Sequence, residues 1–173
     1  DLRVKRAAAA YLGGSPDEIA LTQSTTMGLA LTYLGLPLRA GHEVLTTAHD
    51  HYAHHEAIRL AALRSGASTR RIALFDSLAE LPAITVDSIV SRIKQAIRPE
   101  TRVVALTWVH SQTGLKLPLR AIAAAIREAN AGRTDADRVL MIVDGVHGIG
   151  CEDETIAETG CDIFVAGTHK WLF

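Results

Sequence analysis

The chain lacks the features that mark a disulfide scaffold, a membrane protein or a nucleic-acid-binding protein. It contains two cysteines, Cys151 and Cys161, among 173 residues, which is too few for a disulfide framework, and nothing near them has metal-ligand spacing. No apolar run is long enough to cross a bilayer. The formal net charge of -1 provides no electrostatic reason to bind nucleic acid or an anionic membrane surface. We therefore expect no metal, no membrane contact and no nucleic-acid partner.

The scarcity of cysteine also makes a reduced, cytoplasmic protein the default expectation. No secretory leader is visible, and the sequence leaves open a leader that has been removed. The length suggests one domain, and 48% hydrophobic residues suffice for a substantial core. Asp1 begins inside a helical pattern, and Phe173 ends the chain without a helix cap. We therefore expect residues 1–173 to be a domain that is incomplete at both ends.

Strand and helix patterns alternate along the chain. Short apolar runs predict buried strands, and longer amphipathic stretches predict helices. Because the strands are apolar throughout, both faces of the sheet should be covered. The pattern predicts an α/β fold, a three-layer sandwich around a mainly parallel central sheet. The expected strands are 19–22, 43–47, 70–75, 102–109, 139–143 and 162–166, and the expected helices are 1–12, 23–36, 58–64, 86–97, 119–131 and 154–159.

Polar residues gather where these strands end. In parallel α/β sheets, ligands bind beyond the carboxyl ends of the strands. Helix capping explains each cluster singly, but it explains less well the convergence of hydroxyls, imidazoles, a carboxylate and a lysine. The sequence therefore predicts a site at this edge of the sheet. The clusters are Ser24–Thr26, His49–His51, His110–Thr113, Asp144–His147 and Thr168–Lys170.

Two charged residues stand out because they follow apolar strands directly. Lys170 lies just past the strand 162–166, on a loop that begins at Gly167. A lysine at a buried strand end is either an ion-pair partner or a reactive amine. Asp144 ends the strand 139–143, where a carboxylate is costly unless it is paired. A helix cap or an ion pair is the ordinary explanation for it.

The hydroxyls and histidines each allow more than one interpretation. Residues 23–26 open a helix, so they serve either as caps or as an anion site at the positive helix end. Four of the eight histidines lie between 49 and 55, where a metal site, a ring stacked on a flat ligand and a solvated helix start are alternatives. Spacing places His51 beside His55, and Asp50 beside His54. The absence of an HExxH signature and of a third ligand disfavours the metal.

Together these residues resemble the large domain of the class V aminotransferase-like enzymes, which have fold type I and depend on pyridoxal phosphate. The family includes cysteine desulfurases, selenocysteine lyases and isopenicillin N epimerase. The most specific segments are Asp144-Gly-Val-His147 and then Gly167-Thr-His-Lys170, and the resemblance covers essentially the whole chain. It implies pyridoxal 5'-phosphate as cofactor, an amino acid or amine as substrate, and a homodimer.

The resemblance also implies a role for each matching residue. Lys170 resembles the lysine that forms a Schiff base with the cofactor, and Asp144 resembles the carboxylate that pairs with the pyridinium nitrogen. His51 matches the imidazole over the cofactor ring, and the resemblance implies that these three residues are catalytic. His147 resembles the group beside the ring's phenolic oxygen. The other cofactor contacts that the resemblance implies are Thr25, Thr26, Met27, Ser111 and His169.

The reaction type stays open at this point. An epimerase-like or aminotransferase-like reaction is the first reading, and a cysteine desulfurase or C–S lyase-like reaction is the alternative. Neither Cys151 nor Cys161 matches the reactive cysteine of a desulfurase, because both precede Lys170. A third reading is a non-catalytic fragment that retains only the fold. A metal-dependent hydrolase built on the histidines is disfavoured by the intact pair of Asp144 and Lys170.

Overall fold

The computed structural model describes residues 1–172, and its centre is a parallel β-sheet. The strand order is β2-β1-β3-β4-β5, and each neighbouring pair is parallel. All carboxyl ends therefore meet along one edge, as the sequence predicts. The strands are β1 (Glu43–Thr47), β2 (Ser68–Ile72), β3 (Thr101–Thr107), β4 (Leu140–Asp144) and β5 (Ile163–Val165).

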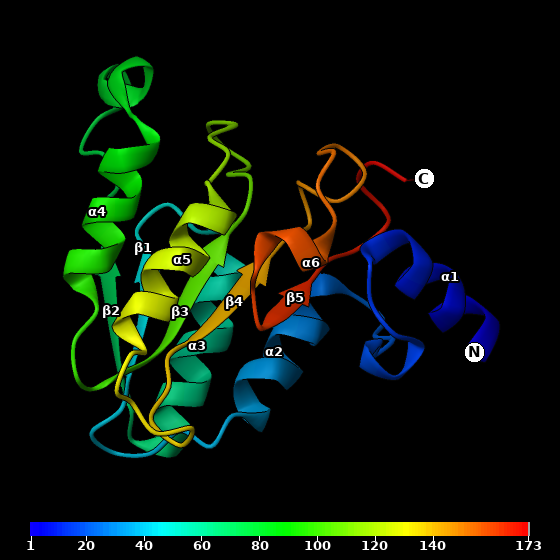
Figure 1. Cartoon of the computed structure of the whole chain (residues 1–173), viewed down its shortest axis with the longest axis horizontal. Coiled ribbons are helices and arrows are strands. Elements are labelled where there is room, and N and C mark those ends of the chain that lie inside the picture. Colours follow the sequence, from blue (N-terminus) through cyan, green and yellow to red (C-terminus); the bar gives the residue numbers. More distant parts are fainter. Residues whose placement is uncertain (173) are drawn as a thin grey trace.

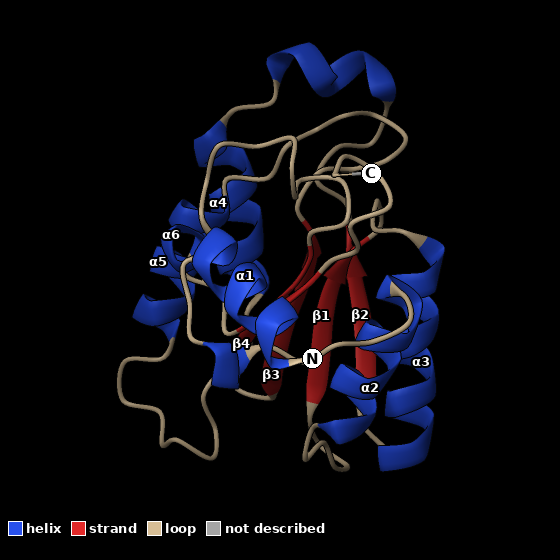
Figure 2. Cartoon of the chain, turned by 90° about the vertical axis from the view of Figure 1, so that its right-hand side faces the viewer, coloured by secondary structure: helices blue, strands red, loops and turns tan. Residues whose placement is uncertain are grey.

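Helices cover both faces of this sheet (Figure 2). Successive residues of a strand point to opposite faces. Val104 and Leu106 accordingly belong to the core on one face, and Val103 and Ala105 to the core on the other. The predicted three-layer α/β architecture is confirmed. One layer contains α2 (Thr25–Gly35) and α3 (Tyr52–Ser65), and the other contains α4 (Val86–Ala96), α5 (Leu119–Ala129) and α6 (Ile156–Thr159).

Local chemistry explains where several helices begin and end. The Ser24 hydroxyl accepts a hydrogen bond from the Met27 N–H at 3.1 Å, and the Thr85 hydroxyl accepts one from the Ser88 N–H at the same distance. Each bond satisfies an amide that has no partner within its helix. Helix α3 ends at Gly66, whose φ of 74° lies in the left-handed region that glycine tolerates best.

Helix α1 (Leu2–Leu12) lies beside the layers rather than within them (Figure 1). Among its residues Ala9 alone is buried. A β-carbon added at Gly13, just past the helix, would lie 3.3 Å from Cβ of Thr155, so the end of α1 packs against the segment that precedes α6. No helix within residues 1–172 has the length and apolar character that crossing a membrane requires.

Some sequence predictions of local structure were wrong. Residues 19–22 form an extended, mostly exposed link between a short 3-10 helix (Pro16–Glu18) and α2, not a strand. The link forms no ladder with either edge strand of the sheet, β5 or β2. The strand expected at 70–75 lies at Ser68–Ile72, and the last helix is confined to Ile156–Thr159. A short 3-10 helix at Leu78–Ala83 was not expected.

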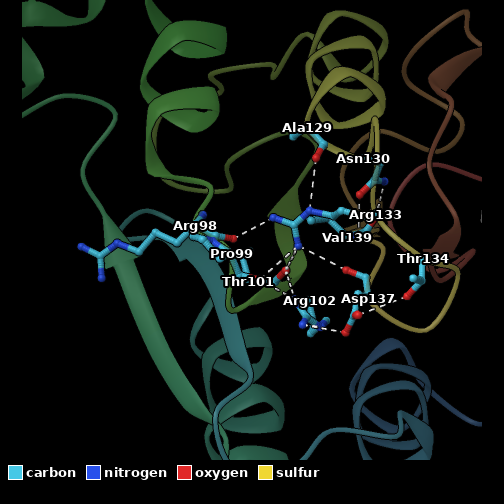
Figure 3. Close-up of polar contacts among 10 residues, drawn as sticks. All are labelled: Arg98, Pro99, Thr101, Arg102, Ala129, Asn130, Arg133, Thr134, Asp137 and Val139. Atoms are coloured by element: carbon cyan, nitrogen blue, oxygen red, sulfur yellow. Dashed lines mark hydrogen bonds and ion pairs between the residues drawn. The ribbon is translucent and has the colours of Figure 1, made fainter.

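Arg133 fastens the loops at the amino-terminal edge of the sheet, opposite the predicted site (Figure 3). Beside it, Arg102 forms an ion pair with Asp137 at 2.8 Å. Backbone carbonyls that are shielded from water need hydrogen-bond donors. The Arg133 guanidinium donates to carbonyls of both the α4–β3 link and the α5–β4 link. Arg133 donates to the carbonyl oxygens of Arg98, Pro99, Thr101, Ala129 and Asp137 at 2.8 to 3.3 Å.

Candidate functional site

Asp144 lies at the middle of the carboxyl edge, as the last residue of β4. Its register neighbours are Thr107 of β3 and Val165 of β5. The side chain is buried, and the one hydrogen bond to its carboxylate within residues 1–172 comes from the Val146 N–H at 3.1 Å. Burial raises the pKa of Asp144, and the His54 charge and the Val146 bond oppose this only in part. A cation or a further N–H donor beside this carboxylate would favour its ionised form.

His147 lies three residues beyond Asp144 and is half-buried. Burial lowers the pKa of His147, and the charge of Lys170 lowers it further. The Trp171 indole N–H donates to the backbone oxygen of His147 at 2.9 Å, so the loop after β4 and the turn after β5 lie against each other. The other charges that act on His147 belong to Asp144, His51 and His169. The fold therefore brings five of the predicted site residues into one region.

Lys170 lies in a turn just past β5, as the sequence predicts. The turn is closed by a hydrogen bond from the Leu172 N–H to the Thr168 carbonyl at 3.2 Å. The side chains of Thr168, His169 and Lys170 are all exposed. Strand β5 ends at Val165. Lys170 lies five residues further on, outside the part of the chain that the sheet and its helices bury.

The start of α2 packs directly against the end of β5. A β-carbon at Gly28 would lie 2.7 Å from Cγ1 of Val165. At Gly167 it would lie 2.8 Å from the Thr25 hydroxyl and 2.8 Å from Nδ1 of His169. That hydroxyl is buried and has no hydrogen-bond partner in the part of the chain that the structure describes. Glycine at 167 thus leaves space beside an unused hydroxyl, which is the kind of group that holds an anionic ligand oxygen.

Some backbone N–H groups at the start of α2 are used by the helix cap, and others are free to bind a ligand. The Met27 N–H, expected from the resemblance to face a phosphate, donates instead to the Ser24 cap. The N–H groups of Thr25 and Thr26 have no acceptor within residues 1–172, and the side chains of Thr26 and Met27 are exposed. Capping therefore explains Ser24 and Met27, while Thr25 and Thr26 keep donors at the positive end of the helix.

Asp50 is a buried carboxylate that the sequence analysis considered only as a metal ligand beside His54. Its Oδ2 accepts from the Thr46 hydroxyl and the Thr47 N–H, both at 2.7 Å, and its Oδ1 accepts from the Thr107 N–H at 2.6 Å. Burial alone would raise the pKa of Asp50, but the His54 charge and these hydrogen bonds outweigh it and hold the pKa below its usual value. Asp50 thereby ties the ends of β1 and β3 together.

His51 caps α3 and is half-buried beside this carboxylate. Its Nδ1 accepts from the Ala53 N–H at 3.3 Å, while Nε2 of His55 lies 2.8 Å from the Thr47 carbonyl. Both rings therefore have backbone partners, and they do not converge on a shared point. Among the described residues, no three His, Cys, Asp or Glu side chains are arranged to hold a metal ion.

Ser111 is not brought into the site by any contact that the structure describes. It is exposed in the turn after β3, and no hydrogen bond within residues 1–172 joins it to the other predicted residues. His110 is the buried residue of this loop, and its Nε2 lies 4.0 Å from Oδ1 of Asp50. The sequence analysis named His110 only as a member of the polar cluster 110–113. Its burial could not be predicted there, because it depends on the residues that follow the neighbouring strand β1.

Comparison with known proteins identifies relatives along the whole chain. The model of the family described as aminotransferase class-V matches residues 3–173. Isopenicillin N epimerases from Streptomyces clavuligerus and Amycolatopsis lactamdurans are each 28% identical, over 98% and 95% of this chain and 39% of their own lengths. A probable cysteine desulfurase from Chlamydia trachomatis is 28% identical, over 97% of this chain and 39% of its own length.

Solved structures share the fold. A cystine C–S lyase, solved with its reaction product cysteine persulfide, has a TM-score of 0.82 at 24% identity, covering 98% of this chain and 42% of its own. A cysteine desulfurase from Escherichia coli has a TM-score of 0.79 at 20% identity, over 98% of this chain and 40% of its own. The chain thus spans about two fifths of the length of the proteins that it matches.

Proposed function

Because the chain belongs to the aminotransferase class-V family, we propose that it is the cofactor-binding domain of a pyridoxal-phosphate-dependent enzyme that acts on an amino acid or amine. The observation that carries this proposal is the meeting of Asp144, His147 and Lys170 at one edge of the sheet. Bound pyridoxal phosphate supplies an aldehyde that condenses with amines and a ring that accepts the electrons of a bond broken at the substrate's Cα.

The described residues fit the two ends of this cofactor. The Asp144 carboxylate is buried and accepts a single hydrogen bond within residues 1–172. It can therefore accept a second hydrogen bond from the N–H of a protonated ring nitrogen, and that positive charge would favour the ionised carboxylate. At the other end, the phosphate would accept from the Thr25 hydroxyl and from the N–H groups of Thr25 and Thr26. The partial positive charge at the start of α2 favours the phosphate there.

Lys170 and His51 complete the proposed site. The Lys170 amine is exposed and close enough to His147 to lower the pKa of that imidazole. We assign it two roles: its amine would hold the cofactor aldehyde covalently, and as a free amine it would move a proton at the substrate's Cα. His51 is held by its capping bond to α3, and we assign its ring to the face of the cofactor. Neighbouring His147 and His169 would serve the phenolic oxygen and the phosphate.

For the reaction, we propose an epimerase-like or aminotransferase-like change at Cα. The relatives that are isopenicillin N epimerases support it. The names of other relatives favour a cysteine desulfurase or C–S lyase as second candidate. Cys161 is an unsuitable sulfur carrier for that reaction, because it precedes β5 at the amino edge of the sheet and its half-buried thiol lies 3.2 Å from the Thr159 hydroxyl. A homodimer and a cytoplasmic location, as the sequence predicts, belong to the same proposal.

Covalent trapping tests the proposal. Pyridoxal phosphate is added to the protein, the adduct is reduced with borohydride, and the peptides are mapped. We expect one pyridoxyl group on Lys170, its loss in Lys170→Ala, and its retention in the matched control Lys5→Ala. A label scattered over surface lysines, or no label, would contradict the proposal and leave a chain that has only the fold.

A second measurement separates the two reaction classes. The protein with its cofactor is incubated in deuterated buffer with a panel of amino acids that includes cysteine. Exchange of the Cα hydrogen, followed by NMR, is the expected result for the epimerase-like or aminotransferase-like reaction. The same incubation is repeated with dithiothreitol, which reduces any persulfide sulfur to sulfide. Release of sulfide from cysteine, with pyruvate or alanine as the co-product, would favour the C–S lyase or the desulfurase instead.

A further inference from the structure

Tyr33 of α2 and His54 of α3 meet beneath the proposed site. The Tyr33 hydroxyl lies 2.6 Å from Nε2 of His54, and the two ring centroids are 5.5 Å apart. Both side chains are almost completely buried, with exposures of 1% and 0%. The two helices lie side by side on the same face of the sheet (Figure 2). This contact is therefore a polar link within an otherwise apolar helix pair.

Burial disfavours the charged form of both groups. Burial, followed by the charges of Asp50 and Asp144, raises the pKa of Tyr33 well above its ordinary value. Burial lowers the pKa of His54, although the same two carboxylates oppose that shift. The phenol and the imidazole share one hydrogen bond, and the tautomer of His54 determines which of them donates. Removing either partner would leave a buried polar atom unsatisfied, which is destabilising.

The position of each residue on its helix connects this pair to the site. Tyr33 lies about two turns after Thr25, and His54 lies about one turn after the helix cap His51. Thr25 and His51 both face the carboxyl edge of the sheet. The other hydrogen bond between α2 and α3 within residues 1–172 runs from Arg64, near the end of α3, to the Leu34 carbonyl at 3.3 Å, and it is exposed. The Tyr33 hydroxyl reaches instead to the first turn of α3, so the buried pair joins α2 to the end of α3 that carries His51.

We propose that Tyr33 and His54 are a positioning pair that sets the spacing between Thr25 and His51 for the two ends of a single ligand. This inference rests on the proposed function, in which the start of α2 holds the phosphate and His51 covers the ring. A ligand gains affinity from both contacts at once only when the protein already holds them at the right spacing. Both side chains are buried, so they act through their helices and not by touching the ligand.

The test compares the whole ligand with its two halves. Dissociation constants are measured for pyridoxal phosphate, for pyridoxal and for inorganic phosphate, with the wild-type protein and with Tyr33→Phe. We expect the variant to bind pyridoxal phosphate about five- to tenfold more weakly, the fold-change that corresponds to one buried hydrogen bond. Its affinities for pyridoxal and for inorganic phosphate should stay at the wild-type values. Tyr11→Phe, on the exposed side of α1, is the matched control.

Each other outcome has a defined meaning. Equal losses for all three ligands would show general loosening, and no loss for pyridoxal phosphate would show that the pair is irrelevant; both overturn the inference. Failure of the wild-type protein to bind pyridoxal phosphate would overturn the proposed function, and this inference with it.

A double variant separates positioning from stability. Tyr33→Phe combined with His54→Leu replaces both polar partners with apolar groups, so Tm should recover toward the wild-type value. The affinity for pyridoxal phosphate should remain low in the same protein. Recovery of both Tm and affinity would show that the pair only stabilises the fold and would overturn the positioning role.

Discussion

The Asp50 carboxylate accepts a hydrogen bond from the backbone N–H of Thr107 at 2.6 Å, across a sequence separation of 57 residues. Its other oxygen serves Thr46 and Thr47 at the end of β1. One buried side chain thus joins two neighbouring strands at the edge where the site lies. Asp144 ends the next strand, β4, and differs from Asp50 in its environment. Its carboxylate accepts one hydrogen bond, and its pKa is raised whereas that of Asp50 is lowered.

Asp50→Asn should destabilise the protein at neutral pH. The amide can accept through one oxygen only, and its NH2 group would face a donor. We expect a loss of about 3 kcal/mol in the free energy of unfolding, measured by urea denaturation, because hydrogen bonds to charged groups are among the stronger ones. Asp17→Asn, an exposed change, is the control and should have little effect. Wild-type stability in the Asp50→Asn variant would contradict the assigned role.

The effect of Asp50→Asn should also depend on pH. The pKa of Asp50 is lowered in the folded protein, so its stabilisation is present above the unfolded-state pKa of about 4 and is lost as the pH falls through the folded value. The difference between wild type and variant should therefore narrow in acid. A difference that stays constant from pH 7 down into acid would contradict the prediction.

Asp144→Asn should have the opposite effect on the cofactor-free protein. Burial raises the pKa of Asp144, so the carboxyl starts to destabilise the fold as the pH rises through the unfolded-state pKa of about 4, and the loss is complete above the folded value. We expect the variant to unfold at a higher urea concentration than wild type at pH 7. The gain should disappear below about pH 4, where the carboxyl is protonated in both states. The same variant should bind pyridoxal phosphate more weakly, and a less stable variant at pH 7 would contradict this account.

Gly28→Ala should push α2 away from β5. The new methyl group would lie 2.7 Å from Cγ1 of Val165, and overpacking of this kind costs about 2 kcal/mol. Adding Val165→Ala should make the Gly28→Ala change less costly, and a double-mutant cycle measures that coupling. Gly35→Ala in the same helix is the control, because its β-carbon would meet no atom within 4 Å. Equal effects at both glycines would exclude the proposed clash.

Arg133→Lys should loosen the amino-terminal edge although it keeps the charge. A lysine ammonium cannot reproduce the planar fork that serves five backbone carbonyls. We expect a loss of about 2 kcal/mol in the free energy of unfolding, since several part-buried carbonyls lose their donor. Arg6→Lys on α1 is the control, because Arg6 has no hydrogen bond or ion pair within residues 1–172. Unchanged stability of Arg133→Lys would show that water replaces the lost donors.

The sequence alone determined the class of fold and the edge at which polar groups collect. Continuous apolar runs such as 139–143 form strands covered on both sides because only helices on both faces keep their side chains from water. The order of the Asp144 and Lys170 segments was sufficient to predict the family, which the matching family model confirms. The strand pattern depends on side chains a few residues apart, and the family resemblance depends on the order of short segments along the chain, so both can be read without the tertiary structure.

Tertiary structure decided what depends on distant partners. The run 19–22 has the pattern of a strand but lies outside the sheet, where it is mostly exposed and pairs with neither edge strand. The roles of Asp50 and of the pair Tyr33 and His54 follow from strand order and helix packing, which place residues together that sequence spacing does not relate. The exposure of Lys170 also depends on tertiary structure, because a side chain is buried only where distant parts of the chain pack against it.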